Sequence, residues 1–224
     1  TLLIQQGRVN TELQEGLMRT RMVPFKSQLT RFRRLIRQTS NELQKEVIFE
    51  LHGGEQEIDR RVLEKITAPL EHLLRNAIAH GIETPEQRIQ AGKTPKGYIT
   101  LFIEREGSEI SIKILDDGKG LDINAIKKKA VERGLMLPDA ELSDKDVIQF
   151  ILESGFTTAS GLSQISGRGV GMDVVITEIK QLNGTLDIDS QQGKGSEFKI
   201  LMPLTMSVSR ALMVQAGEET FAIP

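Results

Sequence analysis

An amphipathic repeat between Val62 and Ile78 is the feature that most constrains the fold of this 224-residue chain. Its apolar residues recur at spacings of three and four, which places them on one face of a helix that must pack against a core. Asp59 is expected to cap the helix, and Pro69 predicts a bend or a break near Ala68. The apolar face consists of Val62, Leu63, Ile66, Leu70, Leu73, Leu74, Ala77 and Ile78.

Three polar side chains, His72, Asn76 and His80, follow one another at intervals of four along the edge of this apolar face, before Gly81 ends the helix. An amide oxygen is a hard ligand that Mg²⁺ accepts, and imidazoles can donate to phosphate oxygens. The row therefore suits a metal-bound polyphosphate. A simple solvated edge is the alternative interpretation for this helix taken alone.

The amino-acid composition limits the classes of protein to which this chain can belong. Hydrophobic residues make up 38% of the sequence, which is enough for one main domain and a small appendage. The net charge of -2, with basic and acidic residues interspersed, gives no indication of nucleic-acid binding, and the lack of cysteine excludes disulfides and thiolate sites. No apolar run approaches the roughly 20 residues that cross a bilayer, and no stretch has the pattern expected of a signal peptide. We therefore expect no transmembrane segment and a cytoplasmic location.

Two segments, residues 98–103 and 109–115, have the pattern of antiparallel strands. The second runs directly into the sequence Asp-Asp-Gly-Lys-Gly, in which Asp116 would be a buried acceptor at the strand end. Such a carboxylate can accept from the exocyclic amine that adenine offers and guanine does not offer at that position. Gly118 and Gly120 are expected to turn the chain with positive φ and to let a flat ligand approach. An ordinary Asp-Gly turn is the alternative.

A second glycine-rich stretch, residues 167–171, reads Gly-Arg-Gly-Val-Gly and leads into a helical pattern over residues 172–182. A turn of this kind presents free N–H groups and the positive end of the helix dipole, which together bind phosphate. Its spacing matches neither the P-loop nor the dinucleotide-binding fingerprint. The small polar residues 154–166 before it predict a loop or a lid.

The remaining elements are predicted from periodicity and turn residues. Arg21 to Pro24 is expected to be a hinge, and His52 a surface histidine at the end of a strand. Helices are expected at residues 1–20, 25–43, 85–88, 123–134 and 143–152, and strands at residues 47–51, 185–189, 196–202, 211–214 and 220–223.

Five segments together resemble the nucleotide-binding boxes of the GHKL ATPase superfamily: residues 72–83, 116–122, 155–158, 167–175 and 193–198. The motif sequences are most similar to those of CheA-type chemotaxis histidine kinases, including hybrid relatives that serve type IV pili. The phrases that carry the likeness are His-Leu-Leu-Arg-Asn-Ala, His-Gly-Ile-Glu, Ser-Gly-Arg-Gly-Val-Gly-Met-Asp-Val-Val and Met-Pro-Leu-Thr. The resemblance implies an α+β fold of the Bergerat type, an α/β sandwich in which helices cover one face of a mixed sheet and ATP lies under a lid.

The resemblance also implies an organisation and a set of partners. Residues 1–22 would end a helical dimerisation domain, residues 23–204 would form the ATP-binding catalytic domain, and residues 205–224 would begin a CheW-like regulatory domain. The enzyme would be a homodimeric protein-histidine kinase that phosphorylates a histidine of a separate phosphotransfer domain. A response regulator would act downstream, and a coupling protein would link the kinase to chemoreceptor-like arrays.

By the same resemblance, Asn76 would ligate Mg²⁺, and His72, Arg75 and His80 would lie near the phosphates as catalytic residues. Asp116 would bind the adenine amine, between Gly118 and Gly120 along the base. The hydroxyl of Ser196 stands where many relatives carry threonine, near the adenine. The other nucleotide-binding residues implied are Gly167, Arg168, Gly169, Val170, Gly171 and Met172.

Two alternatives follow from departures within the first box. Ala79 stands where the family usually has Asp, which removes one carboxylate and leaves open an ATP-binding scaffold with lost or weak transfer activity. A hydrolysing relative would carry a Glu base one turn before Asn76. This chain has His72 there, and a carboxylate is the stronger activator of water.

Overall fold

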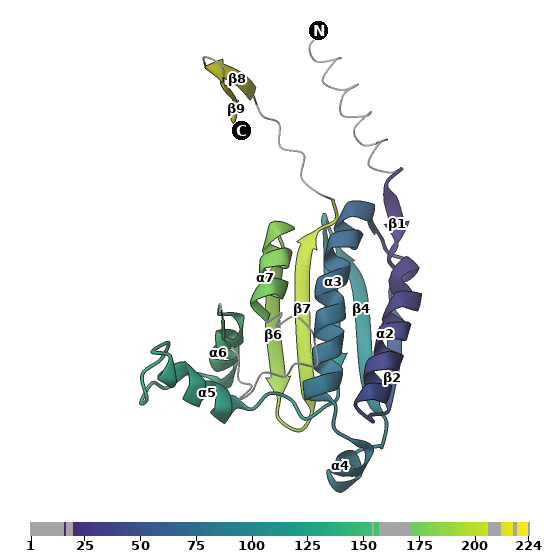
Figure 1. The fold of residues 1–224 in the computed structure, drawn as a ribbon, viewed down its shortest axis with the longest axis vertical. Coiled ribbons are helices and arrows are strands. Elements are labelled where there is room, and N and C mark those ends of the chain that lie inside the picture. The colour runs from purple at the N-terminus through teal and green to yellow at the C-terminus, as the bar shows by residue number, and fades with distance from the viewer. Residues whose placement is uncertain are drawn as a thin grey trace.

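A five-stranded mixed sheet forms the centre of the fold (Figure 1). The computed structural model describes residues 16, 20–153, 155–156, 172–205, 212–216 and 219–223. The strand order is β2-β4-β5-β7-β6, with β2 parallel to β4 and every other pair antiparallel. The strands are β2 (Val47–His52), β4 (Gly97–Glu106), β5 (Glu109–Asp116), β6 (Thr185–Gln191) and β7 (Gly195–Pro203).

Helices α2, α3 and α7 lie over one face of this sheet, so the predicted sandwich is confirmed (Figure 1). The side chains of Leu70, Leu73 and Leu74 on α3 are fully buried, as are Ile99 and Leu101 of β4 in the same core. The helical segments are η1 (Phe25–Gln28), α2 (Leu29–Glu42), α3 (Arg60–Asn76), η2 (Ala77–Gly81), α4 (Pro85–Gln90), α5 (Ile123–Glu132), α6 (Asp144–Gln149), η3 (Phe150–Leu152) and α7 (Met172–Gln181).

Helix α3 begins as its sequence predicts. The Asp59 carboxylate accepts from the Arg61 N–H at 2.8 Å, and the same carboxylate forms an ion pair with Arg21. Of the bend or break expected near Ala68, the break is wrong, because α3 is continuous through Pro69, and the bend stays a prediction. Proline removes only one backbone hydrogen bond, and burial of the neighbouring turns in the core keeps the helix intact.

The expected hinge at residues 21–24 is a short strand instead. Strand β1 (Met22–Pro24) pairs antiparallel with β3 (Glu57–Asp59), which the sequence analysis had missed. A proline is compatible with this position because it ends a strand at a sheet edge. The helix expected from Phe25 starts as a 3₁₀ turn and becomes α-helical at Leu29.

Two parts do not belong to the main hydrophobic core. Helices α5 and α6 enclose a small cluster of Ile126, Ala130, Val147 and Phe156. Strands β8 (Leu212–Ala216) and β9 (Glu219–Ile223) form an antiparallel hairpin, close to the predicted strands. The predicted N-terminal helix and the lid fall almost entirely outside the described residues. None of the helices in the described ranges is long and apolar enough to cross a membrane.

Candidate functional site

The end of strand β5 places Asp116 in a buried position, 8% exposed, as the sequence predicts. Its Oδ1 atom accepts from the Gly118 N–H at 2.9 Å, and its register partner across the sheet is Ser196 of β7. Burial raises the pKa of Asp116 to about 6, and the nearby charge of Asp117 adds to the rise, while the backbone N–H of Gly118 opposes it. The strand end thus carries a carboxyl group poised between its neutral and charged forms.

The two glycines after Asp116 have different reasons to be glycine. Gly120 has a φ of +73°, as expected. The prediction of a positive φ was wrong for Gly118, which is not among the positive-φ glycines of the described residues. A Cβ atom on Gly118 would lie 2.2 Å from the carbonyl oxygen of Gly81, so glycine is needed there because two backbone segments touch.

This contact joins the Asp116 loop to the C-terminal end of the polar-row helix. The Gly81 carbonyl accepts from the Lys119 N–H at 3.0 Å. A Cβ on Gly81 would lie 3.0 Å from the Asp116 Oδ1 atom. The structure therefore brings together the two sequence stretches that were predicted to serve one ligand.

The polar row itself spans two kinds of helix. His72 and Asn76 belong to α3, and both are partly buried. His80 is exposed and lies in η2, a π-helical turn in which the Ile82 N–H donates to the Ala77 carbonyl at 2.8 Å. Gly81 ends the helix as predicted, but through this wider turn.

Lys45 supports the π turn, and the sequence analysis had not singled it out. Its Nζ atom donates to the carbonyls of Ile78 at 2.7 Å and Ala79 at 2.8 Å. Burial lowers the pKa of Lys45, and the charge of Lys119 lowers it further. A cation therefore sits against the carbonyl end of the helix, where the dipole favours it.

Both imidazoles of the row have a depressed pKa. Burial is the main cause for His72, and the charge of Arg75 adds to it, whereas Asp173 on α7 opposes it. The His80 residue is exposed, but neighbouring residues keep part of the water from its ring. This partial desolvation is the main cause of its lowered pKa, with added repulsion from Lys45 and Lys119. The row is therefore neutral at pH 7, and each ring offers one N–H donor and one acceptor.

The other predicted nucleotide-binding residues are only partly described. Met172 is partly buried at the start of α7 and packs on the core, while Gly167 to Gly171 lie outside the described residues. Ser196 is buried, and its hydroxyl lies 3.1 Å from that of Ser190. The Ser190 hydroxyl accepts from the Leu121 N–H at 2.9 Å, so this pair links β6 and β7 to the segment after Gly120.

A metal at this site would have to share its ligands with the nucleotide. Within the described ranges, no group of three or more His, Asp or Glu residues gathers at one point. Mg²⁺ is usually held by one or two protein ligands together with phosphate oxygens and water. The partly buried amide of Asn76 fits such a role.

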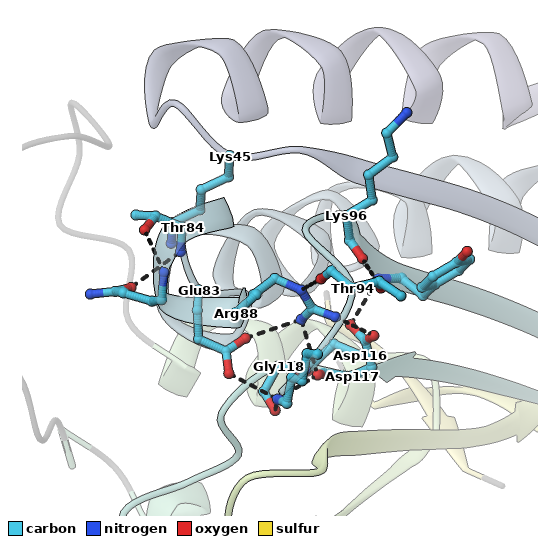
Figure 2. Close-up of polar contacts among 12 residues, drawn as sticks. Lys45, Glu83, Thr84, Arg88, Thr94, Lys96, Asp116, Asp117 and Gly118 are labelled. Atoms are coloured by element: carbon cyan, nitrogen blue, oxygen red, sulfur yellow. Dashed lines mark hydrogen bonds and ion pairs between the residues drawn. The ribbon is translucent and has the colours of Figure 1, made fainter. Parts of the chain in front are cut away.

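A buried ionic network that no sequence pattern had indicated lies behind the Asp116 loop (Figure 2). Arg88 of α4 is only 1% exposed and pairs with Glu83 and Asp117. Lys93 also pairs with Glu83. Arg88 was part of a predicted short helix, and only the family motif that ends in Glu83 pointed to this region.

Comparison with known proteins agrees with this geometry. Residues 65–206 match the family "Histidine kinase-, DNA gyrase B-, and HSP90-like ATPase". The chain is 43% identical over 218 residues to the chemotaxis protein CheA of Treponema pallidum, covering 97% of this chain and 27% of that protein. It is 43% identical over 219 residues to CheA of Bacillus subtilis, covering 97% and 33%.

A third relative carries a related name. The sensor histidine kinase CheAY of Helicobacter pylori is 44% identical over 218 residues, covering 96% of this chain and 27% of that protein. The chain thus spans about a quarter to a third of the length of these relatives. It belongs to the histidine kinase-, DNA gyrase B- and HSP90-like ATPase family and, within it, to the CheA type.

Proposed function

We propose that this chain is the ATP-binding catalytic core of a CheA-like protein-histidine kinase in chemotaxis or motility signalling. It transfers the γ-phosphate of ATP to a histidine on a separate phosphotransfer domain. The observation that carries the proposal is the buried Asp116 carboxyl, held directly against the end of the helix that bears Asn76. The names of the relatives support the same activity.

At the base end, Asp116 accepts from the exocyclic amine of adenine. Guanine presents an oxygen there, which would face the carboxylate without a proton between them. Gly118 and Gly120 let the loop beside the base pack against the backbone of Gly81 and Gln191, and Ser196 lies at the register position opposite Asp116. Burial makes this hydrogen bond strong because little water competes for it.

At the phosphate end, Asn76 would provide the protein ligand for Mg²⁺, and the ion would supply positive charge to the phosphates. The neutral imidazoles of His72 and His80 donate to phosphate oxygens, and Arg75 adds a fixed positive charge. These groups orient the γ-phosphate in line with the incoming histidine nitrogen. By resemblance, the glycine-rich run completes the phosphate site through Gly167, Arg168, Gly169, Val170, Gly171 and Met172.

The acceptor histidine belongs to another domain or to the dimer partner. His72 and His80 are used in the site. His52 is exposed at the end of β2 and stacks on Phe102 with ring centroids 4.8 Å apart. The proposed assembly is a cytoplasmic homodimer through residues 1–22, with a regulatory domain that begins at residue 205 and binds a coupling protein of receptor arrays. A response regulator takes the phosphate onward, and service of type IV pili stays a prediction.

An ATP-binding scaffold without transfer activity is the second candidate, and one observation favours it. Ala79 offers no carboxylate at a partly exposed position beside the row, and its carbonyl is bound by Lys45. Hydrolysis fits less well, because His72 stands where a carboxylate base is needed.

The deciding experiment follows labelled γ-phosphate from Mg-ATP to a separately supplied histidine-phosphotransfer domain. Wild type is compared with Asn76→Asp, and exposed Arg34→Met on α2 is the matched control. Acid-labile, base-stable label that is lost only in the Asn76 variant supports the kinase. ATP binding without transfer to any acceptor rejects it in favour of the scaffold, and Ala79→Asp then tests whether the missing carboxylate is the cause.

A further inference from the structure

The guanidinium of Arg88 is buried and hydrogen-bonded through all three of its nitrogen atoms, although α4 is a short helix at the edge of the fold (Figures 1 and 2). Its Nε atom donates to the Thr94 carbonyl at 2.7 Å, and its Nη1 atom donates to Glu83 Oε2 at 3.1 Å. Towards the Asp116 loop, Nη1 donates to the Asp117 carbonyl at 3.2 Å and Nη2 to Asp117 Oδ2 at 2.7 Å. Removing a charged group from water is unfavourable, and these hydrogen bonds and ion pairs offset that penalty for Arg88.

Lys93 acts on the same loop from the turn after α4. Its Nζ atom donates to Glu83 Oε1 at 2.8 Å, to the Asp117 carbonyl at 2.9 Å and to the Gly118 carbonyl at 2.7 Å. These three acceptors use the full donor capacity of an ammonium group. Two of them are main-chain oxygens, so Lys93 fixes the path of the backbone directly after Asp116.

The Asp117 carboxylate adds a link between this network and strand β4. While Oδ2 is bound by Arg88, Oδ1 accepts from the Tyr98 N–H of β4 at 2.8 Å. Asp117 thus connects strand β4 to α4 through its own side chain (Figure 2). The Lys93 ammonium group and both carboxylate oxygens of Glu83 and Asp117 are bonded within this network, so we expect the network to affect nucleotide binding through the loop that it holds.

We propose that Arg88 and Lys93 are positioning residues for adenine: they clamp the Asp117 and Gly118 backbone so that Asp116 is aligned with the base before the nucleotide arrives. The inference rests on the proposed function and deepens it. The hydrogen bonds from Arg88 and Lys93 hold the backbone carbonyls of the two residues that follow Asp116, whose carboxylate binds the base. Small displacements there misalign the hydrogen bond and the ring contact together.

The network also sets the charge around Asp116. The carboxylates of Asp117 and Glu83 raise the pKa of Asp116, whereas backbone hydrogen bonding from Gly118 and Ser196 lowers it. Arg88 and Lys93 are ion-paired with those two carboxylates or bound to the adjoining backbone. Removing either cation therefore leaves more uncompensated negative charge beside Asp116, while removing the Asp117 charge has the opposite effect.

The test compares Arg88→Met, Lys93→Met and Asp117→Asn with wild type and with the control Arg34→Met. Calorimetry gives the dissociation constants for adenosine and for Mg-ATP between pH 5 and 8, and transfer assays give kcat and KM. We expect each network variant to bind both ligands roughly 10-fold more weakly, because the loop that aligns Asp116 with the base is no longer held. The kcat at saturating ATP should stay within about 2-fold, because the phosphate groups are not displaced.

The pH profile separates positioning from a general loss of structure. The midpoint of adenosine binding should move up in Arg88→Met and Lys93→Met, and down in Asp117→Asn. Unchanged adenosine affinity, or a midpoint that moves the same way in all three variants, overturns the inference. If Arg88→Met does not fold, as judged by circular dichroism, the other two variants decide by the same criteria. A wild-type protein that binds neither ligand contradicts the proposed function instead.

Discussion

The two halves of the site differ in how completely they are formed. Around Asp116, buried charges are paired and the loop backbone is held by three side chains. Along α3, His72 and Asn76 are partly buried, His80 is exposed, and their side chains form no hydrogen bond to another described residue. The first half is organised before a ligand binds, whereas the second leaves its donors and acceptors available.

This difference matches the chemistry proposed for each half. A flat, neutral base gains affinity from a rigid acceptor, because no ordering cost is paid on binding. A polyphosphate brings its own charge and its own metal, so the protein needs donors that are free to adjust. Adenosine affinity should therefore depend on the Asp116 half alone, whereas ATP affinity should depend on both halves of the site.

Replacement of the base acceptor, Asp116→Asn, should have the largest effect. The amide cannot accept strongly from the adenine amine, and adenosine and ATP should both bind about 100-fold more weakly. Asn76→Ala is the matched variant in the other half and should leave adenosine affinity within about 2-fold. Calorimetric titration measures both. Equal losses of adenosine affinity in the two variants would remove the distinction between the halves.

Gly118→Ala should cost about 2 kcal/mol of stability, because the new methyl group meets the Gly81 carbonyl and forces the two halves apart. The free energy of unfolding is obtained from urea titration. Gly92→Ala is the control, since a Cβ there has no neighbour within 4 Å and the cost comes only from its φ of +74°. A Gly118 variant no less stable than this control would show that the backbone contact is not tight.

Acid should weaken adenosine binding. Because the pKa of Asp116 is raised to about 6, lowering the pH from 7.5 to 5 protonates the acceptor and should reduce affinity about 10-fold. Unfolding behaves in the opposite way: the native carboxyl binds its proton more tightly than the unfolded one, so Asp116 contributes less stability as pH rises through 4 to 6. The difference between wild type and Asp116→Asn isolates both trends. A flat adenosine profile would mean that the neutral acid binds equally well.

Lys45→Met should have the smallest effect. It leaves the Ile78 and Ala79 carbonyls without their donor, at about 1 kcal/mol of stability. It also removes one cation that lowers the pKa of His80, so that pKa should rise towards its ordinary value. Histidine resonances followed by NMR during a pH titration give the change, with exposed Lys65→Met as the control. An unaltered His80 titration would place Lys45 outside its electrostatic environment.

Much of the fold could be predicted because its signals are local. The apolar face of α3, the Asp59 cap and the alternation of β4 and β5 are each contained in one stretch of sequence. The position of Asp116 follows from the end of a strand. Each depends on neighbours in the chain, so no knowledge of tertiary contacts was required.

The rest depended on contacts between distant segments. Arg88 looks like an exposed arginine of a short helix, and its burial becomes visible only when Glu83 and Asp117 are brought to either side. Gly118 was predicted for its φ but is required by the approach of Gly81. The pairing of β1 with β3 likewise joins segments more than thirty residues apart. A pattern within one short stretch of sequence contains no signal for contacts between distant segments.

The π turn of η2 makes the number of residues between Asn76 and Gly81 as important as their identity. Deletion of one residue there would let the turn relax to an ordinary α-helix, and the chain beyond it would shift by about 1.5 Å and rotate by about 100°. Substitution of the partly exposed Ala79 can be absorbed locally, but a single-codon deletion would carry Gly81 away from the Asp116 loop and Glu83 away from Arg88 and Lys93. The turn should therefore tolerate amino-acid substitutions better than insertions or deletions.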